Sequence, residues 1–232
     1  PEEIYQHLVG ALTPRDMAGK RVLVTAGPTR EAIDPVRFIS NHSSGKMGYA
    51  VARAAENRGG QVTLVTGPVS LDPPPGVACI RVQTCDEMAG AMLEQFPRAD
   101  IIIKVAAVAD YKPIHCQDQK IKKTPGQKGL TLEMAENTDI LRQLGARKKK
   151  NQFLVGFAAE THDLEAHARS KMEKKNLDMI VANTVGVEGS GFQADTNKVK
   201  IFLKQGSIKN VPLMEKDQVA HILLDTVLEH QD

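Results

Sequence analysis

Residues 21–28 read RVLVTAGP, a short β-branched apolar run that ends in Gly-Pro. Residues 61–68 read QVTLVTGP and repeat that ending. Short apolar runs bounded by turn residues are typical of buried strands. The strongest strand pattern in the chain is ADIIIKVAAVADY, residues 99–111. Similar patterns predict further strands over residues 78–84, 129–135, 152–160 and 178–185.

Helical patterns alternate with these strands. Apolar positions at helical spacing predict helices over residues 47–58, 86–96, 137–150, 162–176 and 215–230. Residues 198–214 form two apolar runs around Gln205–Gly206, which predicts an antiparallel hairpin. Strands that are apolar on both faces and alternate with helices indicate a mostly parallel sheet covered on both sides. We therefore predict an α/β, Rossmann-like domain with a mostly parallel sheet, helices on both faces and a C-terminal antiparallel hairpin.

The composition is that of an ordinary globular domain. The chain has 232 residues, of which 41% are hydrophobic and 25% charged, and its net charge is +2. This charge is too small to indicate a nucleic acid or membrane partner, and no apolar stretch approaches the roughly 20 residues of a membrane span. The three cysteines lack metal-type spacing and fit a reduced, cytoplasmic setting.

The first 19 residues differ in character from the rest of the chain. Residues 1–12, PEEIYQHLVGAL, predict a short amphipathic helix, and TPRDMAGK after them reads as a polar connector. The chain begins with Pro rather than Met. We expect residues 1–19 to be a helix and linker that follow an upstream domain, and residues 20–232 to form the Rossmann-like domain.

A polar bend precedes the helix that is predicted from Met47. Residues 37–46 read RFISNHSSGK. Asp34–Pro35 is expected to begin a short turn before it, and Ser43 or Ser44 can cap the following helix. A helix N-terminus with small residues and nearby positive charge also suits an anion. On composition alone, a simple helix cap and a cradle for an anionic ligand both remain open.

Several charged residues follow strand ends, where ligands bind in a doubly wound sheet. Asp110 can accept hydrogen bonds from a base or sugar, or simply end a loop. The run KIKK, residues 120–123, and the pair Lys171 and Lys175 can contact phosphates or form solvated faces. Weak evidence for a metal or acid–base group comes from Glu160, His162 and Asp163.

Motifs of common cofactors and catalytic groups are missing. No G-x-G-x-x-G follows the first predicted strand, and no acidic residue ends the second one to hold a ribose hydroxyl. An NAD-type cofactor is therefore disfavoured. The chain has neither a P-loop nor a G-x-S-x-G nucleophile motif, and no tyrosine is followed by a lysine four residues on, as a short-chain reductase would require.

Five segments occur in order along the chain: TAGPTREAIDPVRFISNHSSGKMG (25–48), AAVADY (106–111), KIKK (120–123), GFAAET (156–161) and KKNLDMIVAN (174–183). Together they resemble bacterial phosphopantothenoylcysteine synthetase, the ligase half of a bifunctional coenzyme A biosynthesis protein. The resemblance extends over about residues 20–230.

The resemblance implies a two-step ligase reaction. The carboxylate of 4′-phosphopantothenate attacks the α-phosphate of CTP, which releases pyrophosphate and forms an acyl-cytidylate. The amine of L-cysteine then displaces CMP and forms an amide. The family also implies Mg²⁺ with the triphosphate, a homodimer and an upstream decarboxylase domain that carries the flavin, so no flavin is expected on this chain. Such chemistry requires mainly positioning and charge neutralisation.

The resemblance also implies roles for single residues. Asn41 matches an asparagine that acts on the acyl-cytidylate, and Lys120 matches the lysine of a mobile flap that stabilises charge on the phosphates. Arg37 matches an arginine that meets an anionic group of the pantothenate substrate. The substrate-binding positions correspond to Arg37, Asn41, Ser43, Ser44 and Gly45. The CTP-binding positions correspond to Lys104, Val105, Ala106, Asp110, Lys120, Thr138, Asp139, Ile140, Leu141, Phe157, Lys171 and Lys175. The metal ligands stay unassigned.

A non-catalytic nucleotide-binding module is an alternative from another class. It would use the same pocket without turnover. Loss of activity in Asn41→Ala or Lys120→Gln, with the fold intact, would argue against such a module.

Overall fold

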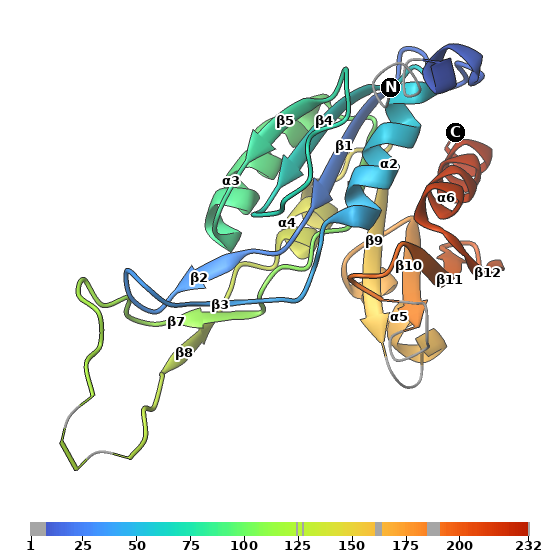
Figure 1. Cartoon of the computed structure of the whole chain (residues 1–232). Helices are drawn as coiled ribbons and strands as arrows, with labels where there is room; N and C mark the ends of the chain where they lie inside the picture. Colours follow the sequence, from blue (N-terminus) through green and yellow to red (C-terminus); the bar gives the residue numbers. More distant parts are fainter. Residues whose placement is uncertain (1–7, 124, 127, 161–163, 185–190, 232) are drawn as a thin grey trace.

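The structure is a computed structural model that describes residues 8–123, 125–126, 128–160, 164–184 and 191–231. Its main element is an eight-stranded sheet in the order β12-β11-β10-β9-β6-β1-β4-β5 (Figure 1). The strands are β1 Arg21–Ala26, β4 Gln61–Thr66, β5 Ala78–Arg81, β6 Ile101–Lys104, β9 Phe153–Glu160, β10 Met179–Thr184, β11 Thr196–Leu203 and β12 Ile208–Glu215.

The strand order creates one crevice near the middle of the sheet. From β5 through β4, β1, β6 and β9 to β10, neighbouring strands are parallel. This is the strand order of the Rossmann fold, and it reverses between β1 and β6. Ligands of such sheets bind outside the carboxyl ends of the strands at the reversal. β11 and β12 add an antiparallel hairpin at one edge, so the predicted fold class is confirmed.

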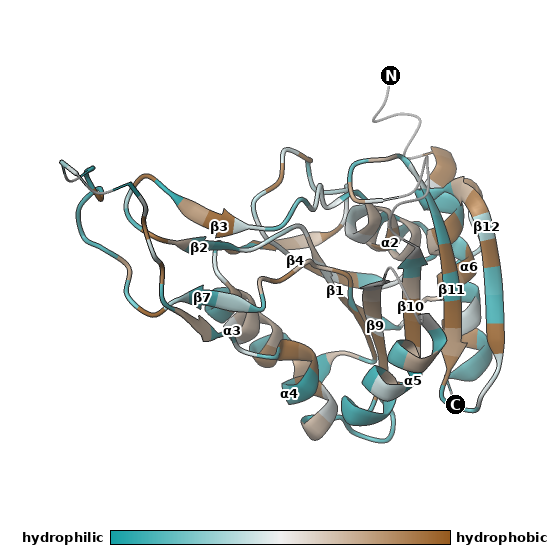
Figure 2. Cartoon of the chain, turned by 90° about the horizontal axis from the view of Figure 1, so that it is seen from below, coloured by the Kyte–Doolittle hydropathy of each residue, from teal (hydrophilic) through white to brown (hydrophobic). Residues whose placement is uncertain are grey.

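Helices cover both faces of the sheet. α2 (Lys46–Asn57) and α6 (Lys216–His230) lie side by side on one face (Figure 1). α3 (Cys85–Gln95), α4 (Ile140–Arg147) and α5 (Leu164–Lys174) contribute to a second hydrophobic core on the other face. The central strands are largely brown in Figure 2, in keeping with their burial between the two cores. Burial on both faces explains the continuous apolar runs of the sequence.

Glycine at position 48 lets α2 lie close to β1. A Cβ atom there would lie 2.6 Å from the Cβ atom of Ala26 and 2.8 Å from the carbonyl oxygen of Thr25. These atoms belong to a buried strand and cannot move aside. The close packing brings the N-terminus of α2 to the carboxyl end of β1, where the strand order reverses.

The strand predicted over residues 99–111 is shorter in the structure. The strand ends with β6 at Lys104, and residues 105–110 run on as irregular chain with one isolated bridge, between Ala107 and Pro28. The N–H groups of Val105, Ala106 and Ala109 donate to the side chains of Thr25 and Thr29 instead of to a neighbouring strand. The helix predicted over residues 137–150 is likewise confined to α4, because Asp139 caps its first turn and the backbone is extended from Lys148.

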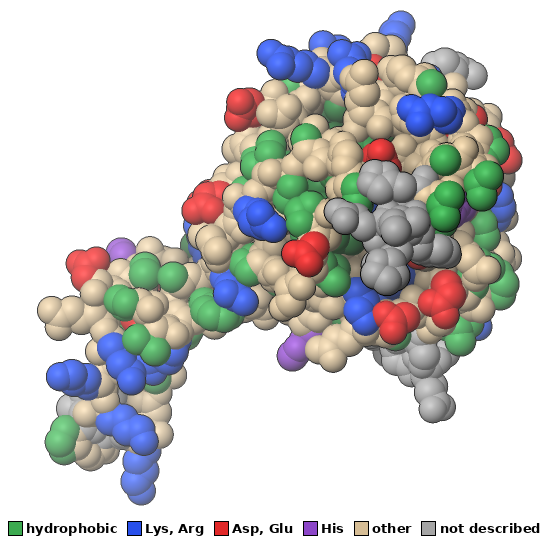
Figure 3. All heavy atoms as spheres, turned by 45° about the horizontal axis from the view of Figure 1, so that its top comes forward, with side chains coloured by type: hydrophobic (Ala, Val, Ile, Leu, Met, Phe, Trp, Pro, Cys, Tyr) green, Lys and Arg blue, Asp and Glu red, His purple; other side chains and the backbone are tan. Residues whose placement is uncertain are grey.

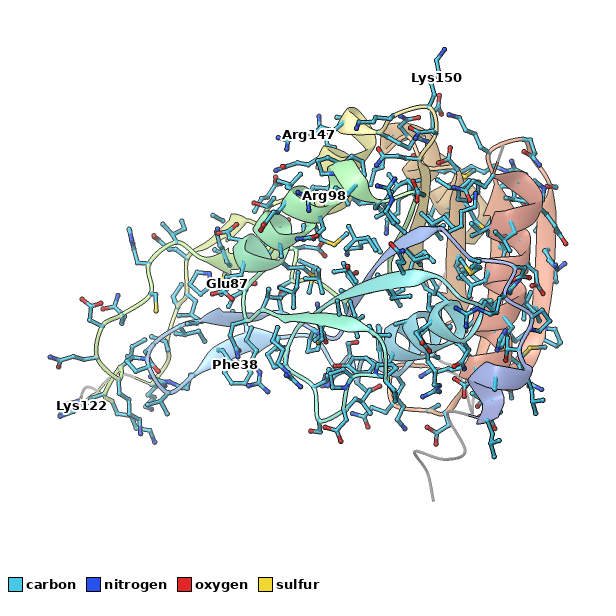
Figure 4. The ribbon with its side chains drawn as sticks, turned by 90° about the horizontal axis from the view of Figure 1, so that it is seen from above. Phe38, Glu87, Arg98, Lys122, Arg147 and Lys150 are labelled. Atoms are coloured by element: carbon cyan, nitrogen blue, oxygen red, sulfur yellow. The ribbon has the colours of Figure 1, made fainter. Side chains whose placement is uncertain are left out.

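Two small sheets form an arm that extends from the main sheet (Figure 1). The arm consists of β2 Arg30–Ala32, β3 Phe38–Ser40, β7 Tyr111–Pro113, β8 Met134–Glu136 and the described residues that connect β2 to β3 and β7 to β8. The strand predicted over residues 129–135 is thus only the short β8, and it lies in the arm. The β2–β3 hairpin was not predicted, because strands of three residues carry no clear alternation. Lys122 lies near the far end of the arm (Figure 4).

The segment before β1 packs against the domain. Residues 8–12 are helical, and Met17 is fully buried in the core beneath α2. The N–H group of Met17 donates to the carbonyl oxygen of Arg58 at 3.0 Å, and Arg58 forms an ion pair with Asp16. That residues 1–19 link two domains of a longer protein stays a prediction. In the part of the chain that the structure describes, no helix has both the length and the apolar character to cross a membrane.

Candidate active site

Two adjoining pockets lie at the point where the strand order reverses. The first has a volume of about 370 Å³ and the second of about 270 Å³. The residues that line both are Lys104, Val108, Asp110, Phe157 and Lys171. Further predicted site residues in the first pocket are Asn41, Ser43, Gly45, Val105 and Ala106. Further predicted site residues in the second are Thr138, Asp139, Ile140, Leu141 and Lys175.

The start of α2 shapes one wall of the first pocket. Gly45 is the N-cap residue, with a φ of 80°, and a Cβ atom there would lie 2.8 Å from a valine side chain. No side chain caps the helix, so the prediction that Ser43 or Ser44 does so is wrong. Ser44 Oγ donates instead to the carbonyl oxygen of Phe192. The N–H groups at the start of α2, beside Lys46, favour a negatively charged ligand.

Thr25 ties the ends of β1 and β6 together. Its Oγ1 accepts hydrogen bonds from the N–H groups of Val105, at 3.1 Å, and Ala106, at 3.0 Å. The chain after β6 therefore passes close to the end of β1. There the carbonyl oxygen of Ala107 accepts a hydrogen bond from Asn41 Nδ2 at 3.0 Å. Asn41 is thus held beside the small residues that follow β6.

Lys104 ends β6 and lines both pockets. Its Nζ donates to the carbonyl oxygen of Ala106 at 2.9 Å. Burial, together with the nearby positive charges of Lys171 and Lys175, lowers the pKa of Lys104 to about 8. A polyanion bound among these three lysines would stabilise their charged forms. The electrostatics of the two pockets therefore suit a phosphorylated ligand.

Lys171 and Lys175 reach the second pocket from the C-terminal end of α5. Lys171 Nζ donates to the carbonyl oxygen of Phe157 at 3.3 Å, and Lys175 Nζ lies 2.9 Å from the carboxylate of Asp139. Burial alone would raise the pKa of Asp139, but the N–H group of Arg142 and the charge of Lys175 lower it. Both predicted lysines face one pocket, although Lys175 follows the last residue of α5.

α3 supports the edge of the second pocket at Thr138. Thr138 Oγ1 donates to the Asp86 carboxylate at 3.0 Å, and its carbonyl oxygen accepts from Cys85 Sγ at 3.3 Å. Burial, with the nearby negative charges of Glu31 and Asp86, raises the pKa of Cys85 to about 11. The thiol is therefore protonated at neutral pH and is not a nucleophile.

Arg37 and Lys120 lie in the arm, outside both pockets. Arg37 forms an ion pair with Asp34 and donates from Nη2 to the carbonyl oxygen of Ile121 at 3.0 Å. Asp34 accepts from the N–H groups of Val36 and Arg37, so it caps a short turn, as predicted. Within one chain the arm brings Arg37 beside the Lys120 segment, but it brings neither residue to the other predicted site residues.

Further residues of the first pocket that were missed in the sequence include Asn183, Phe192, Asn197 and Lys216. They come from β10, the loop before β11, β11 and the first residue of α6. Asn183, Asn197 and Lys216 are buried. Their sequence patterns indicate only that they lie in or near strands and helices, not that they face a pocket. Lys46, whose positive charge beside Gly45 was expected to favour an anion, also lines the first pocket.

The structure gives no support to the hypothesis that Glu160, His162 and Asp163 form a metal or acid–base group. His162 and Asp163 lie outside the described residues, as does the side chain of Glu160. Among the residues whose positions are described, no group of three or more His, Cys, Asp and Glu side chains is placed to hold a metal ion.

Comparison with known proteins agrees with this geometry. Residues 17–230 match the family model described as the DNA/pantothenate metabolism flavoprotein C-terminal domain. The chain belongs to this family. The match covers the whole sheet, both pockets and the arm, and it begins at the buried Met17.

Relatives within the family extend well beyond this chain. The Coenzyme A biosynthesis bifunctional protein CoaBC of Bacillus subtilis is 53% identical over 93% of this chain and 52% of its own length. The protein of the same name from Vibrio cholerae is 48% identical over 99% of this chain and 57% of its own length. The chain therefore spans just over half the length of these curated relatives.

Solved structures show the same fold for this part. The crystal structure of the C-terminal domain of a CoaBC protein has a TM-score of 0.79 and 40% sequence identity. The match covers 93% of this chain and 98% of that one. The chain thus corresponds in extent to one domain of a bifunctional family member.

Proposed function

We propose that the chain is a CTP-dependent phosphopantothenate–cysteine ligase. It would join 4′-phosphopantothenate and L-cysteine and cleave CTP to CMP and pyrophosphate. The observation that carries the proposal is the pair of adjoining pockets, which share Lys104, Asp110 and Lys171 at the strand reversal. Membership of a family whose relatives bear the name of a coenzyme A biosynthesis protein supports it.

The second pocket suits the nucleotide. Lys104, Lys171 and Lys175 lie close enough for the charges of the other two to lower the pKa of Lys104. Three lysines around one pocket neutralise a triphosphate and the negative charge that develops as the α-phosphate is attacked. Thr138 and Asp139, at the start of α4, supply hydrogen-bonding groups beside them. Pyrophosphate would leave from this lysine-rich region.

The first pocket suits the acid substrate and the acyl intermediate. Asn41 Nδ2 lies 3.0 Å from the carbonyl oxygen of Ala107, and both residues line this pocket. An amide N–H group here can donate to the acyl carbonyl when L-cysteine attacks and negative charge develops on that oxygen. The uncapped start of α2 offers N–H groups to the phosphate of 4′-phosphopantothenate. The two steps would then occur where the pockets meet.

Mg²⁺ is expected with the triphosphate. Mg²⁺ usually keeps several waters and binds substrate phosphates with one or two carboxylates. The described residues offer no ready-made cage, but Asp110 lines both pockets and could supply such a carboxylate. When bound, the ion would neutralise part of the phosphate charge.

The exposed apolar surface of the arm supports the proposal that the protein is a homodimer. Its exposed large hydrophobic side chains are Val36, Phe38, Tyr111, Ile114 and Leu130, each 49% to 58% exposed. Lys and Arg side chains gather toward the end of the arm (Figure 3). Apolar residues that are exposed together in this way mark an interaction surface. A second copy that covers them would bring Arg37 and Lys120 toward the pockets of its partner.

The dimer is testable at Phe38. Its ring lies 4.6 Å from the Arg30 guanidinium, and Phe38→Asp would place a charge on the apolar surface. Light scattering should show that the wild type is dimeric and that F38D shifts toward a monomer with slower pyrophosphate release. A wild-type monomer with full activity would overturn this part of the proposal.

The decisive assay follows both half-reactions. Pyrophosphate release is measured with Mg²⁺ and 4′-phosphopantothenate, with CTP or ATP, and CMP formation is measured with and without L-cysteine. CTP-selective release, followed by cysteine-dependent CMP formation, would establish the ligase. A folded protein that binds CTP without turnover would instead be a nucleotide-binding module.

Lys120→Gln adds a second test. We expect slower pyrophosphate release, because loss of one charge contact to the phosphates costs roughly 2–4 kcal/mol of transition-state stabilisation. CTP affinity should change much less. Unchanged release would remove Lys120 from the proposed machinery.

The cellular setting completes the proposal. The relatives' length supports an upstream decarboxylase domain in the intact protein. The free thiols of Cys79, Cys85 and Cys116 fit a reduced, cytoplasmic location. That this chain itself needs no flavin stays a prediction.

A further inference from the structure

One wall of the first pocket has no regular secondary structure of its own. Gly191 and Phe192 line this pocket and belong to the irregular segment 191–195, just before β11. Irregular segments are held mainly by side chains and by their own turns. The position of this wall therefore depends on the side chains that bind its carbonyl groups.

Lys216 binds three of these carbonyl groups. Its Nζ donates to the carbonyl oxygens of Gly191 at 3.0 Å, Phe192 at 3.5 Å and Ala194. The backbone N–H group of Lys216 also donates to the carbonyl oxygen of Asp195 at 2.9 Å. An ammonium group has three N–H donors, which matches three acceptors around one point.

The start of α2 holds the same segment from another element. Ser44 Oγ donates to the carbonyl oxygen of Phe192, the group that Lys216 also contacts. Lys46 Nζ donates to the carbonyl oxygen of Gln193 at 3.0 Å and forms an ion pair with Asp195 at 2.6 Å. Residues 191–195 are thus attached both to α6 and to the helix start at which the acid substrate is proposed to bind.

Lys216 is an unusual residue for a structural contact alone. It is only 5% exposed, and burial, with the nearby charge of Lys46, lowers its pKa to about 8 in spite of Asp195. A buried ammonium group is costly unless it is fully hydrogen-bonded. Because Lys216 lies at the wall of a pocket, we infer that the desolvation cost of burying its ammonium group is offset by its role in holding the shape of the pocket.

We propose that Lys216 is a positioning residue for the ligase reaction. Its ammonium group fixes the carbonyl groups of residues 191–194 and so sets Phe192 as the wall against which 4′-phosphopantothenate binds. The proposal rests on the proposed function for the identity of this substrate. Because Lys216 directs its donors at the protein's own carbonyl groups, it acts through the wall rather than on the anion.

The first test separates the two substrates. Lys216→Met keeps the length of the side chain and removes its donors. We expect the KM for 4′-phosphopantothenate to rise about tenfold, since bonds from a charged donor are lost, while the KM for CTP changes less than about threefold. An equal rise in both KM values, or a change in neither, would overturn the proposal.

Lys216→Arg separates positioning from charge. A planar guanidinium group keeps the positive charge but cannot direct its donors like an ammonium group. We expect K216R to retain the high KM of K216M. Full recovery of the low KM in K216R would show that only the charge matters and would overturn the proposal.

The matched control is Lys209→Met. Lys209 lies on β12, and its Nζ contacts Thr226 of α6, the helix that begins at Lys216, at 3.4 Å. Lys209 lines neither pocket. Both KM values of K209M should equal those of the wild type. If K216M proves too unstable to assay, Ser44→Ala removes another donor to the Phe192 carbonyl group. Because Ser44 is also an expected substrate-binding position, the readout for S44A is hydrogen exchange of residues 191–195. This exchange should be faster than in the wild type, and unchanged exchange would count against the proposal.

A readout without turnover keeps this proposal separate from the proposed function. If the wild type shows no CTP-dependent pyrophosphate release, the ligase assignment fails. Hydrogen exchange of residues 191–195 still tests the wall: it should be faster in K216M than in K209M. Equal exchange in the two variants would overturn the positioning role whatever the activity.

Discussion

The carboxylate of Asp34 accepts a hydrogen bond from the backbone N–H group of Ile121 at 3.1 Å, across 87 residues of sequence. The same carboxylate binds the Arg37 guanidinium group and the N–H groups of Val36 and Arg37. Asp34 is therefore the point at which the β2–β3 turn and the segment of Lys120 are joined. Both proposed arm residues depend on it for their positions.

Asp34→Asn should loosen the arm. The amide removes the charge that holds Arg37 and weakens the bond to Ile121. We expect pyrophosphate release to slow by about tenfold, because the proposed catalytic Lys120 is less well positioned. Asp118→Asn, an exposed position of the same arm, is the matched control and should retain wild-type release. Equal rates in D34N and D118N would contradict the role of Asp34.

The stability difference between wild type and D34N should depend on pH. Arg37 lowers the pKa of Asp34 well below the usual 3.8, so its stabilising contribution is fully present above about pH 4. The contribution is lost as the pH falls below that value toward the pKa of the folded state. Urea unfolding should therefore show a gap between the two proteins at pH 6 that narrows toward pH 3. A gap that stays constant would show that the Asp34 charge does not stabilise the fold.

Asn41→Asp should separate the two half-reactions. A carboxylate cannot donate to the acyl oxygen, so attack by L-cysteine should slow by about 10²–10³. Pyrophosphate release from CTP does not need this donor and should persist as a single turnover. Mass spectrometry would then detect accumulated acyl-cytidylate. Complete loss of pyrophosphate release in N41D would show that Asn41 acts in the first step instead.

CTP binding at pH 8 should take up protons. Lys104 has a pKa of about 8, and bound phosphates raise it by opposite charge. Uptake of up to about half a proton per site is expected, since half of the Lys104 groups are neutral at that pH. Calorimetry in buffers of different ionisation enthalpy measures it. The difference between wild type and Lys104→Met isolates Lys104, because Lys216 is present in both. No difference would place the phosphates away from Lys104.

Two glycine substitutions test the packing that positions the site. Gly48→Ala would push α2 from β1, and such overpacking should lower the free energy of unfolding by about 1–3 kcal/mol. Gly90 lies exposed within α3 with no atom near its missing Cβ, so Gly90→Ala should raise the free energy of unfolding by about 0.5–1 kcal/mol. Urea unfolding compares the two variants. Equal stability of G48A and G90A would contradict the close contact of α2 with β1.

The main sheet was largely predictable because its signals are local. β1 and β4 are continuous apolar runs closed by Gly-Pro, and the helices between strands show their own period. Each such pattern depends on neighbours within about one turn or strand. The strand at β6 was predicted too long, because residues that follow it, such as Val105 and Ala109, bond to Thr25 and Thr29, which are distant in sequence.

The candidate site was predictable only in part. The family resemblance indicated Asn41, Lys104, Asp110, Lys171 and Lys175, each of which lines at least one of the two pockets. The prediction that a serine caps α2 was wrong, because the Ser44 hydroxyl donates instead to the carbonyl group of Phe192, 148 residues away. Lys216 went unnoticed for the same reason: its partners lie more than 20 residues before it, in a segment without a pattern of its own.

Local periodicity and motif spacing are thus sufficient for the alternation of strands and helices, the fold class and the family resemblance of this chain. Which strand ends meet is decided in three dimensions, by parallel pairing of β1 with β6 and by the close approach of α2 that Gly48 allows. The arm, with Asp34 at its junction, and the wall held by Lys216 are decided there too. These features rest on single hydrogen bonds and ion pairs between distant residues, and such contacts leave no repeating pattern along the chain.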